Sequence, residues 1–218
     1  MVDIGDPLVK ETLVHDVAER LRTLILTGEM LPGMRLRQED LSRGLGVSRT
    51  PLRQALGLLV EEGFVERSPK AQYAVTTMNQ DSLLDLYRVR RELDGLAASL
   101  AAQRRSDIQL TEMSNELQLM KDAQPHEWFI HHQRFHVLIY EASMNTYLQR
   151  HKNAILLSTR LFNPQLAASQ TRREQSFSEQ VQIWSAIEAQ DSTNAKRKAK
   201  NHITNAMKLL SPEYSGNR

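Results

Sequence analysis

The chain has 218 residues, of which 40% are hydrophobic and 25% charged, and its formal net charge is +2. This composition is ordinary for a globular protein, and the length allows one large domain or two small ones. The absence of cysteine excludes disulfides, thiolate metal sites and cysteine nucleophiles. No stretch approaches the roughly 18 apolar residues of a membrane span, so we expect no membrane partner and a cytoplasmic location.

The first predicted helix lies within residues 8–29, where apolar side chains recur at helical spacing and Gly28 precedes Pro32-Gly33. Leu36 falls in a short extended bridge after this break. A second, short helix is expected from Glu39 to Leu45, directly before a glycine.

A turn and a third helix follow. Gly46 suits a left-handed turn, and either Ser48 or Thr50 can cap the helix after it. Pro51 is tolerated because it falls in the first helical turn. The helix carries one apolar stripe with the spacing i, i+3, i+4 and i+7, at Leu52, Ala55, Leu56 and Leu59. Gly63 is expected to end it, so the pattern predicts a helix–turn–helix.

Two arginines lie four residues apart on another face of this third helix, Arg49 and Arg53. A helix with a polar, arginine-bearing N-terminal end suits the major groove of DNA. Two arginines alone are more often solvated or paired with acids, so the assignment depends on the helix–turn–helix context. We predict that this is a recognition helix.

Residues 64–67 and 73–76 alternate in character and predict a small β-hairpin, the wing of a winged helix–turn–helix. Its tip carries Arg67 and Lys70, which could reach phosphates or the minor groove. Composition and period change at residues 77–82. We therefore predict a DNA-binding domain over residues 8–77 and an all-helical domain over residues 78–212.

The second half has helical periodicity throughout, interrupted by cap and breaker residues. The predicted helices are Ser82–Arg105, Asp107–Ala123, Glu127–Ser143, Thr146–Phe162, Arg173–Gln190 and Thr193–Leu210. Six helices with short connections indicate an antiparallel bundle. The predicted fold is mainly α, a winged helix–turn–helix followed by a six-helix bundle.

The motifs of both halves resemble those of the GntR transcriptional regulators. In the first half the resemblance lies in residues 32–33, 41–56 and 62–65. The second half is similar to the effector domain of the FadR-like branch, the FCD domain, through residues 90–94, 97–102, 135–143 and 186–187. The resemblance implies a homodimeric, ligand-responsive regulator of a metabolic operon, with repression as the expected sign. It implies a palindromic DNA operator and a small-molecule effector, expected to be a carboxylate.

The resemblance also implies that DNA is contacted by Ser48, Arg49, Thr50, Pro51 and Arg53. Arg49 is the expected reader of guanine, through a bidentate contact that is worth about 1–3 kcal/mol of discrimination. The wing departs from the family, because Gln72 stands where a glycine is usual and Ala71 where an arginine is common. Lys70 is the wing residue that could compensate.

Many members of this branch hold a metal with one aspartate and three histidines on three bundle helices. The matching positions here are His132, His136, Gln180 and His202, so His132 replaces the aspartate and Gln180 replaces a histidine. Three imidazoles suit Zn²⁺ or Ni²⁺, and a glutamine carbonyl is a poor fourth ligand. The alternative is that no metal binds, and that His136 and His202 line a polar pocket.

Arg90 matches an arginine that the family keeps on the first bundle helix. It could clamp the carboxylate of an effector, which makes Arg90, His136 and His202 the expected effector-binding residues. Two other interpretations stay open: an ion pair with Asp94 and a contact between the two domains.

Two other functions are compatible with parts of the sequence. A metal-dependent helical-bundle enzyme would need an open metal position and a general base, and no carboxylate lies at a suitable spacing around His132 and His136. We therefore expect no enzyme activity. The other alternative is a DNA-binding regulator whose C-terminal bundle only dimerises.

Overall fold

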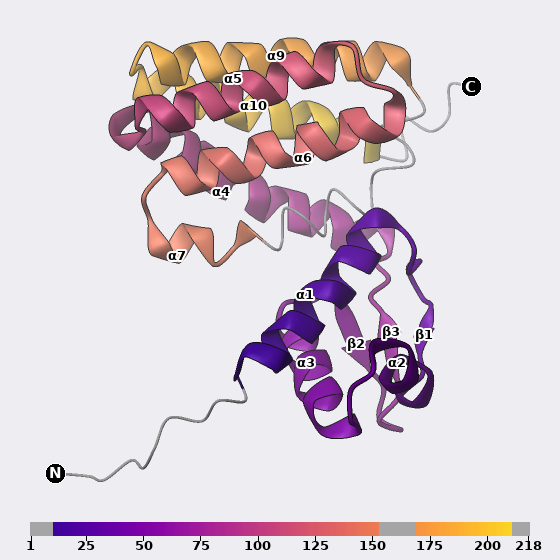
Figure 1. Ribbon diagram of the computed structural model, residues 1–218. Coiled ribbons are helices and arrows are strands. Elements are labelled where there is room, and N and C mark those ends of the chain that lie inside the picture. Colours follow the sequence, from indigo (N-terminus) through magenta and orange to yellow (C-terminus); the bar gives the residue numbers. More distant parts are fainter. Residues whose placement is uncertain (1–10, 153–168, 211–218) are drawn as a thin grey trace, which may run out of the picture. The chain divides into compact units, whose positions relative to one another are not determined.

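The computed structural model describes residues 11–152 and 169–210 (Figure 1). The chain divides into two compact units, Met1–Thr77 and Met78–Arg218, which are described separately here. No helix among the described residues combines the length and the apolar character needed to cross a membrane.

The first unit contains three helices and three short strands within its described residues. They are α1 (Glu11–Thr27), β1 (Arg35–Leu36), α2 (Gln38–Leu45), α3 (Arg49–Glu61), β2 (Val65–Arg67) and β3 (Tyr73–Val75). The strands form an antiparallel sheet in the order β1-β3-β2. The predicted bridge around Leu36 is thus a third strand, in which Leu36 pairs with Tyr73.

The predicted helix–turn–helix is confirmed in its geometry. Gly46 adopts a left-handed φ of 67° after α2, and Gly63 has a φ of 82° just past the end of α3. Ser48 occupies the N-cap position of α3, although its side chain makes no capping hydrogen bond. The apolar stripe of α3 is buried at all four predicted positions, Leu52, Ala55, Leu56 and Leu59. These side chains and the buried face of α1 form the core of the first unit.

The wing is a tight hairpin between β2 and β3. The backbone N–H of Ser68 bonds to the carbonyl of Gln72 at 2.9 Å, and that of Ala71 to the carbonyl of Ser68 at 2.9 Å. Ala71 has a φ of 55°, so it takes the left-handed conformation that glycine adopts most easily. The wing position whose backbone conformation favours glycine is therefore Ala71 rather than Gln72.

The second unit has six helices within its described residues. They are α4 (Gln80–Arg104), α5 (Asp107–Lys121), α6 (Pro125–Ala142), α7 (Thr146–Gln149), α9 (Gln170–Glu188) and α10 (Ser192–Leu210). Local caps account for two of the starts: Asn79 accepts a hydrogen bond from the backbone of Ser82, and Ser106 forms a capping box with Gln109.

One predicted helix is wrong in its extent. The helix expected over Thr146–Phe162 begins at Thr146, where Asn145 caps it, but it ends at Gln149. The backbone N–H of His151 bonds to the carbonyl of Leu148 at 2.9 Å, a tighter i to i+3 connection that closes the last turn. Residues 153–162 of this prediction lie outside the described residues.

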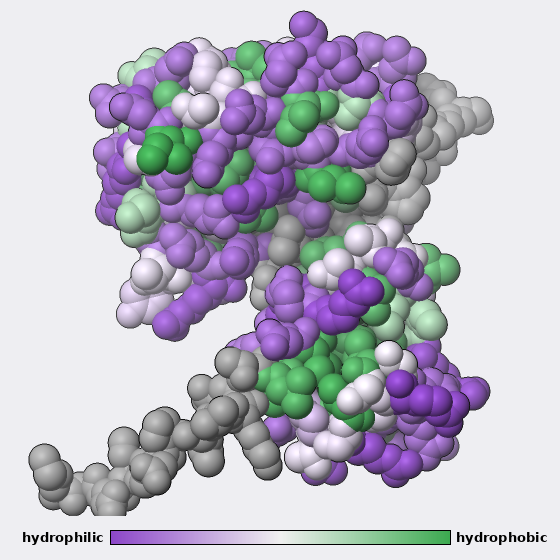
Figure 2. Space-filling model, viewed as in Figure 1, coloured by the Kyte–Doolittle hydropathy of each residue, from purple (hydrophilic) through white to green (hydrophobic). Residues whose placement is uncertain are grey.

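The bundle is held by close packing of α4 on α10 and of α5 on α6, with α9 beside both α10 and α5 (Figure 1). Small residues let α4 approach its neighbours closely: Ala97, Ala98, Ala101 and Ala102 are all buried. At Gly95 a methyl group would collide with the side chain of Lys200 on α10. The visible face of the bundle in Figure 2 is mostly hydrophilic, with hydrophobic residues scattered among the others.

Candidate functional site

Three histidines meet inside the bundle. His132 and His136 lie one turn apart on α6, and His202 comes from α10; all three are 2–3% exposed. The Nε2 atoms of His136 and His202 are 3.2 Å apart. The ring of His132 lies 5.0 Å from that of His136 and 5.8 Å from that of His202. One ring nitrogen from each histidine lies within 4.8 Å of the others, which suits three ligands of one metal ion.

Burial keeps these imidazoles neutral. It holds the pKa of His132 and the pKa of His136 well below the ordinary histidine value, and the charges of nearby cations lower them further. Burial also lowers the pKa of His202, although the adjacent Glu179 carboxylate opposes the shift. Neutral imidazole is the form that binds metals, because the coordinating nitrogen must keep its lone pair.

Glu179 orients the ring of His202 through a hydrogen bond with its Nδ1 atom. Its Oε2 atom lies 2.7 Å from Nδ1 of His202, and the carboxylate also accepts hydrogen bonds from Arg172 at 3.2 Å and from Asn205 at 2.8 Å. Burial acts to raise the pKa of Glu179, but the hydrogen bond with His202 and the charge of Arg172 outweigh it and lower that pKa to about 2. A charged carboxylate on Nδ1 makes that nitrogen the N–H donor and leaves the lone pair on Nε2.

Asp94 on α4 lies near Nδ1 of His136, but at a distance too long for a hydrogen bond. Its Oδ2 atom is 3.6 Å from Nδ1 of His136 and 3.2 Å from Nε of Arg90. Its Oδ1 atom accepts a hydrogen bond from the hydroxyl of Tyr140 at 2.7 Å. Of the interpretations left open for Arg90, the structure therefore shows the ion pair with Asp94.

The fourth predicted ligand, Gln180 on α9, is fully buried near the histidines. Its amide nitrogen donates to the backbone carbonyl of His132 at 3.4 Å. Within the described part of the chain its Oε1 atom has no hydrogen-bond partner, and the same is true of Ser176 Oγ and His132 Nδ1. Buried polar atoms are normally satisfied. A divalent cation fits this donor set, because it would accept the lone pairs of the imidazoles and of the amide oxygen.

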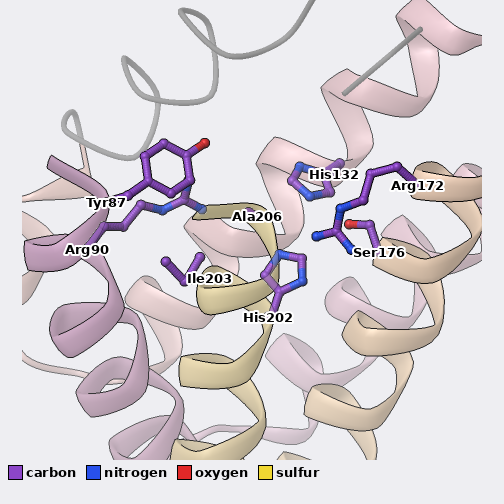
Figure 3. A pocket seen from close by; sticks show the side chains of 8 residues that line it. All are labelled: Tyr87, Arg90, His132, Arg172, Ser176, His202, Ile203 and Ala206. Carbon is purple, nitrogen blue, oxygen red and sulfur yellow. The ribbon is translucent and has the colours of Figure 1, made fainter. Parts of the chain in front are cut away.

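A small cavity adjoins the cluster (Figure 3). It is lined by Tyr87, Arg90, His132, Arg172, Ser176, His202, Ile203 and Ala206. The volume of the cavity is about 10 Å³, which is room for about one water molecule. Figure 3 shows Arg90 and Arg172 reaching toward the cavity from opposite sides. Burial raises the pKa of Tyr87 to about 12, so this residue is a neutral hydrogen-bonding group there.

The sequence indicates Asp94 only as a possible ion-pair partner of Arg90, and it does not identify Arg172 or Glu179 as part of this site. Arg172, Ser176 and Gln180 follow the spacing i, i+4, i+8 on α9, which places them on one helix face. Counting back four and eight residues from the predicted ligand Gln180 would have placed Ser176 and Arg172 on the same helix face. Trp128 is buried against the cluster, with its ring 4.7 Å from that of His132, whereas the Trp184 indole N–H donates to the carbonyl of Leu110.

The first unit presents the residues expected at DNA. Ser48, Arg49, Thr50, Arg53 and Lys70 are exposed, and Pro51 is half-buried in the first turn of α3. Arg49 donates from Nη2 to Oε1 of Glu39 on α2 at 2.7 Å. Arg35 in β1 and Arg37 directly after it are also exposed and add positive charge to this unit.

Comparison with known proteins agrees with both halves of the chain. Residues 13–75 match the family described as bacterial regulatory proteins, gntR family, and residues 85–205 match the FCD domain. The chain is 26% identical over 152 residues to the uncharacterized HTH-type transcriptional regulator YdhC of Bacillus subtilis, covering 66% of this chain and 68% of YdhC. It is 23% identical over 209 residues to the HTH-type transcriptional repressor GlaR of Escherichia coli, covering 90% of this chain and 95% of GlaR.

The solved structure of Escherichia coli McbR has the same fold, with a TM-score of 0.78 at 22% identity over 98% of this chain and 100% of that one. The helix–turn–helix, the wing and the helical bundle thus occur together in a known class of protein. The chain belongs to the GntR family of DNA-binding transcriptional regulators, with an N-terminal winged helix–turn–helix and a C-terminal FCD domain.

Proposed function

We propose that this regulator represses a metabolic operon, binds a palindromic operator as a homodimer, and responds to a small anionic effector held in its helical bundle. Repression is supported by the similarity to GlaR, which is named as a repressor. A dimer is supported by the size of the DNA-reading surface. One recognition helix offers few contacts, whereas two helices that meet half-sites one helical turn apart give nanomolar affinity.

The observation that carries the effector proposal is the convergence of His132, His136 and His202. These imidazoles are neutral and buried, and two of them have a carboxylate behind them. With the amide oxygen of Gln180 they would hold one divalent metal, Zn²⁺ or Ni²⁺. The chain supplies the ligands, and the hydrogen bond between Nδ1 of His202 and Glu179 leaves the lone pair of that ring on Nε2.

The charge balance of the site favours a carboxylate effector. Four neutral ligands leave the charge of a bound divalent cation uncompensated, and two arginines, Arg90 and Arg172, line the adjoining cavity. Arg90 and Arg172 are balanced by Asp94 and Glu179, so the net positive charge that attracts an anion would be that of the metal. A guanidinium can in addition hold a carboxylate through two parallel hydrogen bonds. Without a metal, His136 and His202 would bind the effector directly. Because the cavity is small, an effector larger than water must displace side chains that line it.

We infer no catalytic role for the cluster. A metal-dependent enzyme needs a carboxylate or histidine that is available as a general base. Asp94 accepts from Arg90 and Tyr140, and Glu179 is engaged by three other side chains. Both carboxylates are thus already bound by other side chains, so neither is available as a general base.

Elemental analysis and thermal unfolding of the purified full chain test the proposal. We expect about one zinc or nickel per chain, lost in the His202→Ala variant. The metal should be kept in the control His131→Ala, because His131 lies on α6 next to His132 but its imidazole bonds to Glu116 instead. A panel of carboxylates should then raise the melting temperature of the metal-loaded protein. If neither metals nor carboxylates change the melting temperature, the bundle is a dimerisation module without an effector. Turnover of any panel member by the metal-loaded chain would contradict the non-enzymatic role.

A further inference from the structure

An ion pair links the two helices of the helix–turn–helix at the proposed DNA-reading end. Arg49 is the first residue of α3, and Glu39 lies in the first turn of α2. Nη2 of Arg49 donates to Oε1 of Glu39 at 2.7 Å. Both side chains are exposed, at 70% for Arg49 and 72% for Glu39, so the pair faces solvent.

The turn between the helices fixes the distance between these two side chains. The backbone N–H of Val47 bonds to the carbonyl of Ser42 at 3.1 Å, and Gly46 adopts the left-handed conformation that closes α2. This arrangement ends a helix in a single defined geometry. Because the apolar stripe of α3 is buried, that helix cannot rotate to carry Arg49 away from α2.

The pair adds little to the free energy of unfolding, because exposed ion pairs contribute little to protein stability. It also opposes DNA binding in one respect, since a carboxylate beside the duplex is repelled by the phosphates. A negative charge at this place therefore weakens the attraction of the recognition helix for any DNA, whatever its sequence.

The benefit lies in orientation. An arginine side chain has several freely rotating bonds, and ordering them on binding reduces affinity. A guanidinium has five N–H donors in a fixed fork, and one hydrogen bond to Glu39 leaves further donors for the O6 and N7 atoms of guanine. Held by the carboxylate, Arg49 is also less able to swing to a phosphate, a contact that carries no sequence information.

We propose that Glu39 is a positioning residue that sets the base preference of Arg49. The proposal rests on the guanine contact proposed for Arg49. It predicts that Glu39 increases the discrimination between guanine and other bases while it decreases the affinity for DNA of any sequence. A residue that only added negative charge would decrease the affinity for all DNA without changing the discrimination between bases.

The experiment uses the full chain and duplexes with a randomised centre, from which a preferred sequence is selected. Affinity is then measured by fluorescence anisotropy, at one salt concentration, for the selected duplex and for versions with single base pairs replaced. The base pair read by Arg49 is the one whose replacement has no further effect in Arg49→Ala. The discrimination ratio at that base pair is compared among the parent chain, Glu39→Gln and the control Asp40→Asn.

Asp40 is the matched control because it is an exposed acid next to Glu39 in the first turn of the same helix. Both variants remove one negative charge, so both should bind non-specific DNA more tightly. Only Glu39→Gln should lower the discrimination ratio, by roughly fivefold or more, the lower end of what a bidentate contact provides.

Two failures can be told apart. If Glu39→Gln and Asp40→Asn keep the same discrimination ratio as the parent chain, Glu39 does not position Arg49 and the inference is overturned. If Arg49→Ala itself leaves affinity and base preference unchanged, the guanine contact proposed for Arg49 is wrong. Circular dichroism of each variant checks that the helices are retained.

Discussion

The Nε2 atoms of His136 and His202 face each other across 3.2 Å, while the Nδ1 atom of each ring faces a carboxylate. A hydrogen bond between these two atoms needs a proton on one Nε2, whereas a metal bound by both rings needs a lone pair on each. A cation bound by both Nε2 atoms would replace this hydrogen bond with two metal–nitrogen bonds, and the proton of each ring would then lie on Nδ1. We therefore expect metal binding to exchange one hydrogen bond for two coordinate bonds and to stabilise the bundle.

Metal binding should stabilise the bundle by a measurable amount. At a free metal concentration one hundred times the Kd, the free energy of unfolding rises by about 2.7 kcal/mol. In a domain of this size that corresponds to an increase in Tm of roughly 5–10 °C. Tryptophan fluorescence can follow the change, because both tryptophans, Trp128 and Trp184, lie in the bundle. Excess chelator should reverse the increase, and an unchanged Tm on adding Zn²⁺ and Ni²⁺ would argue against the site.

The three buried histidines predict that the metal-free bundle is sensitive to acid. Their pKa values are lowered in the folded chain, so below about pH 6.5 the unfolded state binds protons that the folded state does not. The free energy of unfolding should therefore be highest above pH 6.5. It should fall with decreasing pH by up to about 1.4 kcal/mol per pH unit for each histidine.

Glu179 adds to this dependence at lower pH, because its pKa of about 2 lies below that of an unfolded glutamate. Its contribution is complete above about pH 4.5 and is lost as the pH falls toward 2. Urea denaturation in the presence of chelator, followed by tryptophan fluorescence from pH 8 to pH 5, isolates the histidines. His132→Asn should reduce the slope. A stability that does not change over this range would show that the histidines are solvated or already charged.

Asp94 should control how tightly the metal is held. Replacing it by asparagine removes the negative charge behind His136 and lowers the basicity of that imidazole, which we expect to weaken metal affinity by roughly 10–100-fold. Competition with a chromophoric chelator measures the change. Asp85→Asn is the control, since Asp85 lies on the same helix but is exposed and pairs with Arg88. Equal affinities in the two variants would mean that Asp94 serves only to hold Arg90 and Tyr140.

The DNA-binding half could be predicted closely because its signals are local. Gly46 and Gly63 occupy turns that need a left-handed backbone, and Pro51 fits only the first turn of a helix. The apolar residues of α3 all follow the spacing of an α-helix. These constraints act within a few residues, so they locate α3 to within one or two residues. The segment around Leu36 could be predicted only as an extended bridge and not as the strand β1. Two residues are too few to show a periodic pattern, and the partner strand β3 is 37 or more residues away in the chain.

The histidine cluster was foreseen from a spacing of four residues on α6 and from family resemblance, and the structure brings His132, His136 and His202 together. The sequence does not predict which charged groups lie beside the histidines. Asp94 and Glu179 meet the cluster from other helices, and Arg172 lies 30 residues before His202. Such contacts depend on how the helices rotate against one another in the bundle, which no local pattern specifies.

A single glycine should stabilise the bundle at the end of α9. Gln190 adopts a left-handed φ of 55°, and the N–H groups of Gln190 and Asp191 bond back to the carbonyls of Ile187 and Ala186 at 3.1 and 3.0 Å. This helix ending favours glycine, because a side chain in the left-handed region costs about 1–2 kcal/mol. Part of the gain is lost to the greater freedom of glycine in the unfolded chain. We expect Gln190→Gly to raise the free energy of unfolding by about 0.5–1 kcal/mol.

The control for this prediction lies in the other unit. Ala71 has the same φ of 55° in the wing, so Ala71→Gly should relieve the same kind of strain there. Because both tryptophans belong to the bundle, fluorescence-detected urea denaturation should show a higher midpoint for Gln190→Gly and an unchanged one for Ala71→Gly. Hydrogen exchange of the amides in β3 should slow only in Ala71→Gly. A lower midpoint for Gln190→Gly would show that the glutamine side chain makes contacts whose loss outweighs the relief of backbone strain.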